Sequence, residues 1–243
     1  MPNYWGVAGF PISHSITPRL FSLVGEFLGI PQAKQIYLEA TSLDELLESC
    51  SQMDGEVWLS CTSPLKHQLA GLTGHVGPSE VDSINQIKRV EGVWHGANTD
   101  GVGFVDACKH FGIDPEGKVL NIRGGGSAAR SVAAQWVERG GLLVTSMGRR
   151  ALPKGPWDEA LTESQSPDIG VDMDVRSGNS LPQKVTAKKQ FIVSYDENTE
   201  PSEFSLVMLA AQHLESWRSL FSPTDSDRLP ELADLLSLSL IHI

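Results

Sequence analysis

The chain has 243 residues, of which 40% are hydrophobic and 20% are charged. This length suffices for one large domain or two small ones, and the composition excludes a fibrous, disordered or disulfide-stabilised protein. The formal net charge of −11 and the lack of a Lys/Arg cluster argue against a nucleic-acid partner, although a local Lys or Arg can still bind a small anion.

The cysteines indicate a reducing compartment. Cys50, Cys61 and Cys108 form no C-x-x-C pair and are odd in number, so neither a disulfide framework nor a metal site is predicted. The first ten residues lack the basic and apolar segments of a signal peptide, and the apolar C-terminal tail is too short to span a bilayer. We therefore expect a cytoplasmic protein without a membrane partner.

Strands and helices alternate in the first part of the chain. Apolar runs predict strands at residues 4–8, 35–38, 57–61, 87–90 and 93–97, the last two joined by the hairpin turn Glu91-Gly92. Helices are predicted from Pro18 with Thr17 as N-cap, after Ser42, and from the residue after Asn98-Thr99-Asp100 to Phe111. This alternation favours an α/β layer.

A second unit of strand, glycine turn, helix and strand follows at residues 118–147. A strand at 118–123 leads into Gly124-Gly125-Gly126, a helix covers 127–139, and a second strand covers 142–147. Beyond it the patterns weaken. They predict strands at 169–173 and 191–194 and helices at 207–221 and 229–238.

The glycine turn is a candidate dinucleotide-binding site. Gly124, Gly126 and Ala129 form a G-x-G-x-x-A pattern between a strand and a helix. Glycines allow a pyrophosphate to approach the helix N-terminus, where free N–H groups and the helix dipole favour anions. The same pattern also occurs as a plain glycine-rich turn, so its position after a strand is what favours the nucleotide interpretation.

The end of the next strand favours NADP over NAD. An NAD site usually has an acidic residue there to bind the ribose hydroxyls. This chain instead has Arg149 and Arg150. Guanidinium groups suit the 2′-phosphate of NADP, although a solvated basic loop is the alternative.

Three further segments carry polar side chains with two possible roles. The hydroxyls of the loop from Gly9 to Pro18 are natural donors to a carboxylate, but taken alone they are better explained as helix caps. The segment Asn98-Thr99-Asp100 before a helix is a further candidate, and capping is its alternative role. Lys66 follows a buried strand and a proline turn, where it either points into a cleft or lies at the surface. Taken singly, none of these segments settles a function.

Their order and spacing resemble the shikimate dehydrogenase family. The motifs are G-x-P-I-x-H-S-x-T-P, T-x-P-x-K, N-T-D-G-x-G-F and the glycine turn, and the resemblance covers residues 4 to about 150. It returns in the segment Met208-Leu209-Ala210-Ala211-Gln212, which is similar to the family's M-L-x-x-Q helix. Trp217 also lies where the family often has tryptophan.

The resemblance implies an α/β fold of two domains. Residues 1–103 and 206–243 would form a discontinuous substrate-binding domain, and residues 104–205 would form an inserted Rossmann-like NADP-binding domain. The ligand would lie in the cleft between them. The implied reaction is the reversible NADP-dependent reduction of 3-dehydroshikimate to shikimate. The expected partner is this small-molecule substrate, with no nucleic acid and no membrane, and the sequence does not give the oligomeric state.

The resemblance also implies roles for individual residues. Lys66 and Asp100 would form the catalytic pair, and Ser15 and Thr17 would hold the substrate carboxylate. The other expected substrate-binding residues are Ser60, Thr62, Asn85, Tyr195 and Gln212. The expected cofactor-binding residues are Gly124, Gly125, Gly126, Ser127, Ala128, Arg149 and Arg150.

Several positions depart from the family pattern. Ser60 replaces the usual Asn, Gln86 replaces Thr in the usual Asn-Thr pair, and Arg123 precedes the glycine turn where an apolar residue is usual. Asp174 stands where the family tends to have a small or hydroxyl residue. The usual Gly-x-Gly before Met208 is absent, and residues 195–208 are shortened, which brings cofactor binding into question.

Three other functions remain open. The first is a shikimate-binding relative that has lost hydride transfer. The altered 195–208 segment argues for this function, whereas the intact Lys66 and Asp100 argue against it. A quinate/shikimate dehydrogenase would share nearly every residue above. A generic Rossmann-type oxidoreductase would match four ordered motifs only by accident.

Overall fold

The computed structural model describes residues 1–74, 76–175, 182–194 and 201–240. Its internal contacts divide the chain into two compact units. Unit 1 comprises Met1–Val76, Ser83–Thr99 and Leu209–Ile243, and unit 2 comprises Gly77–Asp82 and Asp100–Met208. The divisions at 99/100 and 208/209 compare with the expected domain boundaries at 103/104 and 205/206.

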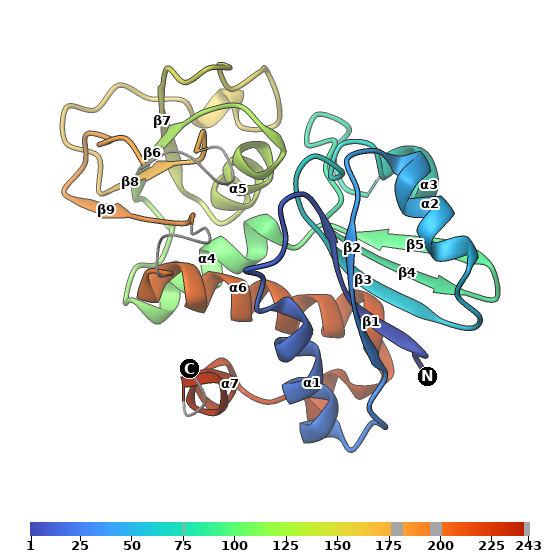
Figure 1. Ribbon diagram of the computed structural model, residues 1–243. Coiled ribbons are helices and arrows are strands. Elements are labelled where there is room, and N and C mark those ends of the chain that lie inside the picture. The colour runs from blue at the N-terminus through green and yellow to red at the C-terminus, as the bar shows by residue number, and fades with distance from the viewer. Residues whose placement is uncertain (75, 176–181, 195–200, 241–243) are drawn as a thin grey trace. The chain divides into compact units, whose positions relative to one another are not determined.

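Unit 1 is built on a five-stranded mixed sheet (Figure 1). Its order is β2-β1-β3-β4-β5, with β1 parallel to both neighbours and β4 and β5 antiparallel. The strands are β1 (Tyr4–Gly9), β2 (Lys34–Glu39), β3 (Val57–Cys61), β4 (Gln86–Val90) and β5 (Val93–Ala97). The predicted hairpin is confirmed, since Glu91 and Gly92 both have positive φ and join Val90 to Val93.

Helices cover both faces of this sheet. On one face, α2 (Leu43–Ser51) and α3 (Ala70–Thr73) pack over an apolar cluster that includes Leu46 and Leu59. The other face carries Trp5 of β1 and Trp58 of β3, because successive side chains of a strand point to opposite faces of the sheet. They meet an aromatic cluster from α1 (Thr17–Leu28) and the π-helix η2 (Trp217–Phe221), made of Phe21, Trp217 and Phe221.

Unit 2 contains a four-stranded parallel sheet in the order β7-β6-β8-β9 (Figure 1). The strands are β6 (Val119–Arg123), β7 (Leu142–Ser146), β8 (Ile169–Asp172) and β9 (Lys189–Phe191). Helix α5 (Ser127–Glu138) connects β6 to β7, and α4 (Asp100–His110) packs on α5. That packing requires Gly101, because a Cβ there would lie 2.3 Å from the carbonyl oxygen of Ser131.

The sequence predicted the strands before residue 173 to within one residue at either end, but its later elements were less accurate. The predicted strand 191–194 is wrong, because the pairing with β8 uses Lys189 to Phe191 and leaves Ile192 exposed. Helix α6 (Glu203–Ser216) begins four residues before the predicted 207, since the Ser202 hydroxyl accepts a hydrogen bond from the Ser205 amide.

The C-terminal end of the chain holds two more elements. The predicted helix 207–221 ends as α6 at Ser216 and continues as η2, and a 3₁₀ helix, η3 (Pro223–Arg228), follows. The predicted helix 229–238 is α7 (Leu232–Leu240). It starts three residues later than predicted because Pro230 lies just before it. No helix among the described residues is long and apolar enough to cross a membrane.

His213 joins α6 to α1 inside unit 1. Its ring is buried and lies edge-on to Phe21, with ring centroids 4.5 Å apart. Its Nε2 accepts a hydrogen bond of 3.0 Å from the indole of Trp217. Burial lowers the pKa of His213 to about 3, against the opposing effect of a hydrogen bond to the Leu20 backbone.

We therefore predict that His213 makes unit 1 sensitive to acid. The unfolded chain binds a proton at this residue below its ordinary pKa of 6.5, whereas the folded chain excludes it until about pH 3. Stability from this residue is fully present above pH 6.5 and is lost as the pH falls, by about 3 kcal/mol at pH 4.5. Urea denaturation between pH 4.5 and 7.5 measures this loss.

The His213→Gln variant should show a flatter pH dependence than the wild type over this range. His67→Gln is the matched control, because His67 is exposed and should leave the dependence unchanged. An unaltered slope in His213→Gln would contradict the account.

Candidate functional site

The loops that follow β1 and β3 lie side by side at the carboxyl edge of the unit 1 sheet. The Phe10 amide donates to the Ser63 carbonyl, and the Thr62 amide donates to the Ala8 carbonyl, each at 2.9 Å. Gly9 has a φ of 141°, and a Cβ there would lie 2.5 Å from the Thr62 side chain. The two motifs, far apart in sequence, are therefore held in contact.

Thr17 begins α1, and Ser15 lies two residues before it in the loop that follows β1. The prediction that Thr17 caps the helix is wrong: the N-cap position is Ile16, which has no side-chain acceptor, and Thr17 lies in the first turn. The Ser15 hydroxyl instead accepts a hydrogen bond of 3.3 Å from the Thr17 amide. The buried Thr17 hydroxyl is thus not used for capping, and two hydroxyls lie where the helix dipole favours an anion.

A buried polar network connects β3, β4 and the segment before α4. The Ser60 hydroxyl donates a hydrogen bond of 2.7 Å to the side-chain carbonyl of Gln86. The side-chain NH2 group of Gln86 in turn donates to the Thr99 hydroxyl at 3.3 Å. Asn85 donates to the same hydroxyl at 3.1 Å and accepts from the Thr99 amide at 2.8 Å. This network fixes the Asn85 side chain, because both ends of its amide are engaged.

The network explains two departures from the family pattern together. Ser60 and Gln86 are direct partners across the antiparallel pair β3–β4, so a short side chain on one strand faces a long one on the other. Gln86 and Thr99 were not among the predicted site residues. The sequence did contain a signal for Gln86, which is a polar residue next to Asn85 at the start of an apolar strand.

Lys66 lies beside Asn85 in unit 1. The Lys66 carbonyl accepts a hydrogen bond of 3.0 Å from the Ile84 amide, and the lysine is half-buried. Burial raises the pKa of the nearby Cys61 thiol, and the Lys66 charge opposes that rise. Lys66 therefore belongs to the same sheet edge as Thr62 and Asn85.

The remaining predicted substrate and catalytic residues are distributed as follows. Asp100 is buried at the first position of α4 in unit 2, directly after Thr99. Gln212 is half-buried on α6 in unit 1, next to His213. Tyr195 lies outside the described residues.

The glycine turn of unit 2 adopts backbone geometry that only glycine accommodates. Gly124 has a φ of 105°, and a Cβ on Gly125 would lie 1.9 Å from the Ala151 carbonyl oxygen. Gly126 is the N-cap of α5, and a Cβ there would meet no atom within 4 Å. Ser127 and Ala128 follow in the first turn of α5 and are half-buried. These residues fit a pyrophosphate at the helix N-terminus.

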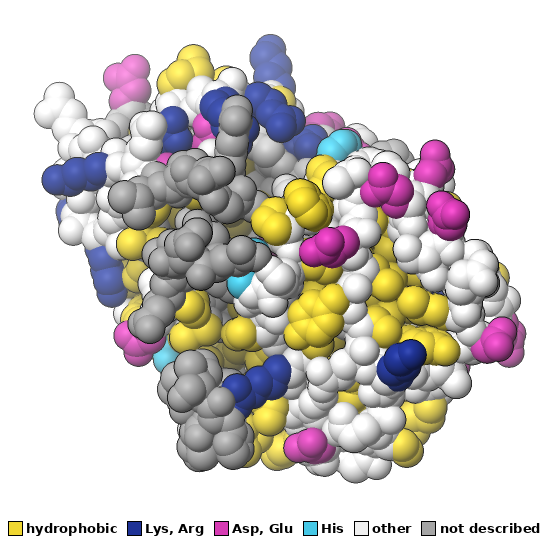
Figure 2. All heavy atoms as spheres, viewed as in Figure 1, with side chains coloured by type: hydrophobic (Ala, Val, Ile, Leu, Met, Phe, Trp, Pro, Cys, Tyr) yellow, Lys and Arg dark blue, Asp and Glu magenta, His cyan; other side chains and the backbone are white. Residues whose placement is uncertain are grey.

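The basic residues after β7 are exposed, but one of them is already paired. Arg149 Nε lies 3.3 Å from a carboxylate oxygen of Asp174, while Arg150 is exposed. At the end of β6, Arg123 forms a 2.9 Å ion pair with Asp172. Figure 2 shows Lys and Arg side chains gathered over the loops around the β6–β9 sheet, which suits an anionic ligand.

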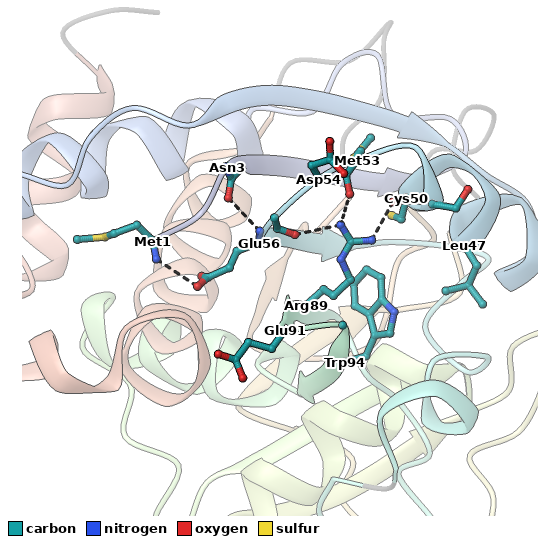
Figure 3. Close-up of a pocket in the computed structure, with 13 residues that line it drawn as sticks. Met1, Asn3, Leu47, Cys50, Met53, Asp54, Glu56, Arg89, Glu91 and Trp94 are labelled. Atoms are coloured by element: carbon teal, nitrogen blue, oxygen red, sulfur yellow. Dashed lines mark hydrogen bonds and ion pairs between the residues drawn. The ribbon is translucent and has the colours of Figure 1, made fainter.

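A pocket with a volume of about 700 Å³ lies at the other end of β3 and contains none of the predicted site residues (Figure 3). Its central cation, Arg89, donates to the carbonyl oxygens of Cys50, Met53 and Gly55. Arg89 thus satisfies carbonyl groups in the last turn of α2 and in the segment after it, which is a structural role.

The curated relatives of the chain are NADP⁺-dependent shikimate dehydrogenases. One from Alkaliphilus metalliredigens is 29% identical over 147 residues, which are 59% of this chain and 51% of the relative. One from Syntrophomonas wolfei is 35% identical over 134 residues, 53% of this chain and 44% of the relative. The chain thus spans about half the length of the curated relatives it matches. No protein-family model matches it.

Solved structures are similar over nearly the whole chain. Shikimate dehydrogenase 1 from Peptoclostridium difficile has a TM-score of 0.74 at 20% identity and covers 97% of this chain and 96% of its own. The Thermus thermophilus shikimate dehydrogenase in complex with NADP(H) and shikimate has a TM-score of 0.74 at 23% identity, with 100% of each chain covered. The predicted resemblance and the two-part α/β fold with a Rossmann-like part are confirmed.

Adjacent glycines of the turn provide a matched pair of substitutions. We predict that Gly125→Ala lowers the free energy of unfolding by about 3 kcal/mol, because its methyl group would overlap the Ala151 carbonyl. Gly126→Ala should cost less than about 1 kcal/mol, since the space is open. Urea denaturation measures both values.

If this turn holds the pyrophosphate of NADP⁺, as we propose below, the same methyl group at Gly126 should weaken NADP⁺ binding about tenfold, because it enters the space in front of the helix N-terminus. Calorimetric titration with NADP⁺ measures this effect. Equal stabilities of the two variants, or undiminished binding to Gly126→Ala, would show that the turn is not the cradle described.

Proposed function

We propose that this protein is an NADP-dependent shikimate dehydrogenase, an oxidoreductase that reversibly reduces the ketone of 3-dehydroshikimate to the hydroxyl of shikimate. The observation that carries the proposal is the convergence of Ser15, Thr62, Lys66 and Asn85 on one sheet edge of unit 1. The glycine turn and Arg149 in unit 2 add a candidate cofactor site. The named relatives support the same reaction.

The polar groups of unit 1 match a small hydroxylated carboxylic acid. Ser15 and Thr17 supply two hydroxyls at the N-terminus of α1 for the carboxylate. Asn85 is held by Thr99, and the hydroxyls of Ser60 and Thr62 lie on the adjoining strand and loop. We assign ring-hydroxyl recognition to these groups and to Gln212, with Tyr195 as a further candidate.

Lys66 and Asp100 are the proposed catalytic pair. During reduction, negative charge develops on the ketone oxygen, and a protonated lysine stabilises that charge and donates the proton. The carboxylate would orient the ammonium group and accept a hydrogen bond from a substrate hydroxyl. The support for this pair is the place of the two residues in the matched motifs, T-x-P-x-K for Lys66 and N-T-D-G-x-G-F for Asp100.

The residues of unit 2 fit the cofactor expected for this reaction. NADPH supplies the hydride when bound. Gly126, Ser127 and Ala128 would hold the pyrophosphate through backbone N–H groups, with Gly124 and Gly125 forming the turn. Arg149 and Arg150 would bind the 2′-phosphate. We also place the protein in the cytoplasm, in keeping with three buried free thiols.

One observation favours a second candidate, a shikimate-binding relative without hydride transfer. The sheet of unit 2 has four described strands. Residues 147–168 connect β7 to β8, and the structure has only a short 3₁₀ helix and no α-helix within this segment. A doubly wound sheet normally has helices in such crossovers. Weak cofactor binding would follow from a poorly supported sheet, whereas the substrate groups of unit 1 would be unaffected. Quinate is an alternative substrate, since it would use nearly the same groups.

A spectrophotometric assay at ~340 nm, the absorbance of reduced nicotinamides, tests the proposed reaction with purified protein, shikimate and NADP⁺. We predict formation of NADPH that depends on shikimate, with slower turnover when NAD⁺ or quinate is substituted. Shikimate binding by calorimetry without any NADPH formation would contradict the proposal and favour the binding-only relative.

Lys66→Ala should lower kcat by about two orders of magnitude or more while the protein stays folded, because the developing charge loses its acid. Lys34→Ala is the matched control, since Lys34 is an exposed lysine of the same unit on β2. Comparable turnover in the two variants would remove Lys66 from the mechanism, and circular dichroism checks the fold of each.

A further inference from the structure

Asp174 holds Arg149 by three separate contacts. One carboxylate oxygen accepts a 2.6 Å hydrogen bond from the Arg149 amide, and the other lies 3.3 Å from Arg149 Nε. The Asp174 carbonyl accepts a third bond, of 3.1 Å, from the guanidinium NH2 group. Both the backbone and the side chain of Arg149 are therefore fixed by one residue that is 25 positions away in sequence.

The contacts use only part of the guanidinium. Of its five N–H groups, the one on Nε faces Asp174 and one on NH2 is bonded to the Asp174 carbonyl. Within the described ranges, the two on NH1 and one on NH2 are left for another acceptor. The Arg149 side chain is 46% exposed, so this edge is open to a ligand. It suits bidentate binding of a phosphate.

Asp174 is itself held in place. Its carboxylate is 8% exposed and lies 3.7 Å from Arg123. Its amide donates to Asp172 at 2.9 Å, and Asp172 pairs with Arg123 at 2.9 Å. The quartet of Arg123, Arg149, Asp172 and Asp174 is balanced in charge, so a carboxylate is kept at this buried position without a net negative charge.

The quartet lies at the edge of the sheet where doubly wound folds bind nucleotides. Arg123 ends β6, Asp172 ends β8, and Arg149 follows β7. A Cβ on Gly124 would be 3.1 Å from the Asp174 Cβ, which places Asp174 beside the glycine turn. The segment after the second strand of such a unit meets the ribose of the adenosine.

We propose that Asp174 is a positioning residue that holds Arg149 for the 2′-phosphate, so that preference for NADP(H) over NAD(H) depends on residue 174. This inference rests on the proposed function for the cofactor class. A free arginine side chain loses conformational freedom when it binds, and Asp174 removes that freedom beforehand. The negative charge of Asp174 opposes phosphate binding, but Arg123 offsets it.

Two nucleotides that differ only in the 2′-phosphate test this inference by calorimetric titration, without turnover. Adenosine 2′,5′-bisphosphate should bind the wild type more tightly than adenosine 5′-monophosphate. Asp174→Ala should reduce the affinity for the bisphosphate about tenfold and change the affinity for the monophosphate by less than about twofold. Arg149→Ala should have the same effect, and the double variant should lose no more than Arg149→Ala alone.

Two variants complete the design. Asp174→Asn keeps an oxygen that can accept from Arg149 and should recover part of the bisphosphate affinity, and it also replaces Asp174→Ala if that variant does not fold. Lys154→Ala removes an exposed positive charge from the same loop and should leave the ratio of the two affinities unchanged. Thermal unfolding checks the fold of every variant.

The outcomes separate this inference from the proposed function. Equal or tighter bisphosphate binding in Asp174→Ala, with the wild-type preference intact, would overturn the positioning role and leave the NADP assignment standing. Failure of the wild type to bind either nucleotide would overturn the proposed cofactor, and the positioning role with it.

Discussion

The parallel pairing of β1 with β3 is the constraint on which the rest of unit 1 depends. Parallel strands end at the same edge of a sheet, so the loop after β1 and the turn after β3 must meet. A glycine makes the close approach possible. Gly9 adopts a φ that side-chain-bearing residues avoid, and a Cβ there would lie 2.5 Å from the Thr62 side chain. The substrate groups proposed here are a consequence of this geometry.

Polar groups at that edge are organised in advance of any ligand. The chain from Ser60 through Gln86 and Thr99 to Asn85 satisfies buried hydrogen-bonding groups that would otherwise be costly. It also leads directly to Asp100 through the peptide bond after Thr99. Unit 2 has a comparable arrangement, since Asp174 fixes Arg149 beside the glycine turn. In both units, residues that depart from the family pattern form the supporting contacts.

Local pattern was sufficient for most of the fold. Alternating apolar residues and the Glu91-Gly92 turn predicted the unit 1 strands, because each is specified by residues close in sequence. The start of α6 and the position of β9 were missed, since a serine cap lies upstream of the apolar run and two of the three residues of β9 are polar. Thr17 looked like a cap by residue type alone, and only the backbone shows that Ile16 holds that position.

The candidate site was predicted residue by residue from ordered motifs, but its contacts could not be. The Ser60–Gln86 bond depends on strand register, and the Arg149–Asp174 pair joins loops that follow β7 and β8. Both look like isolated departures in the sequence. Their meaning appears only when the partner is known, because each pair of residues is complementary in size or charge across a tertiary contact.

The most direct test of the account is a single-turnover experiment with shikimate deuterated at the carbon that carries the oxidised hydroxyl. Protein in molar excess over this substrate is mixed with NADP⁺, and the nicotinamide product is analysed by mass spectrometry. The account predicts that the deuterium appears in the reduced cofactor, with one label transferred for each 3-dehydroshikimate formed. Recovery of intact labelled shikimate, bound but unoxidised, would contradict it and identify a protein that binds this substrate without transferring hydride.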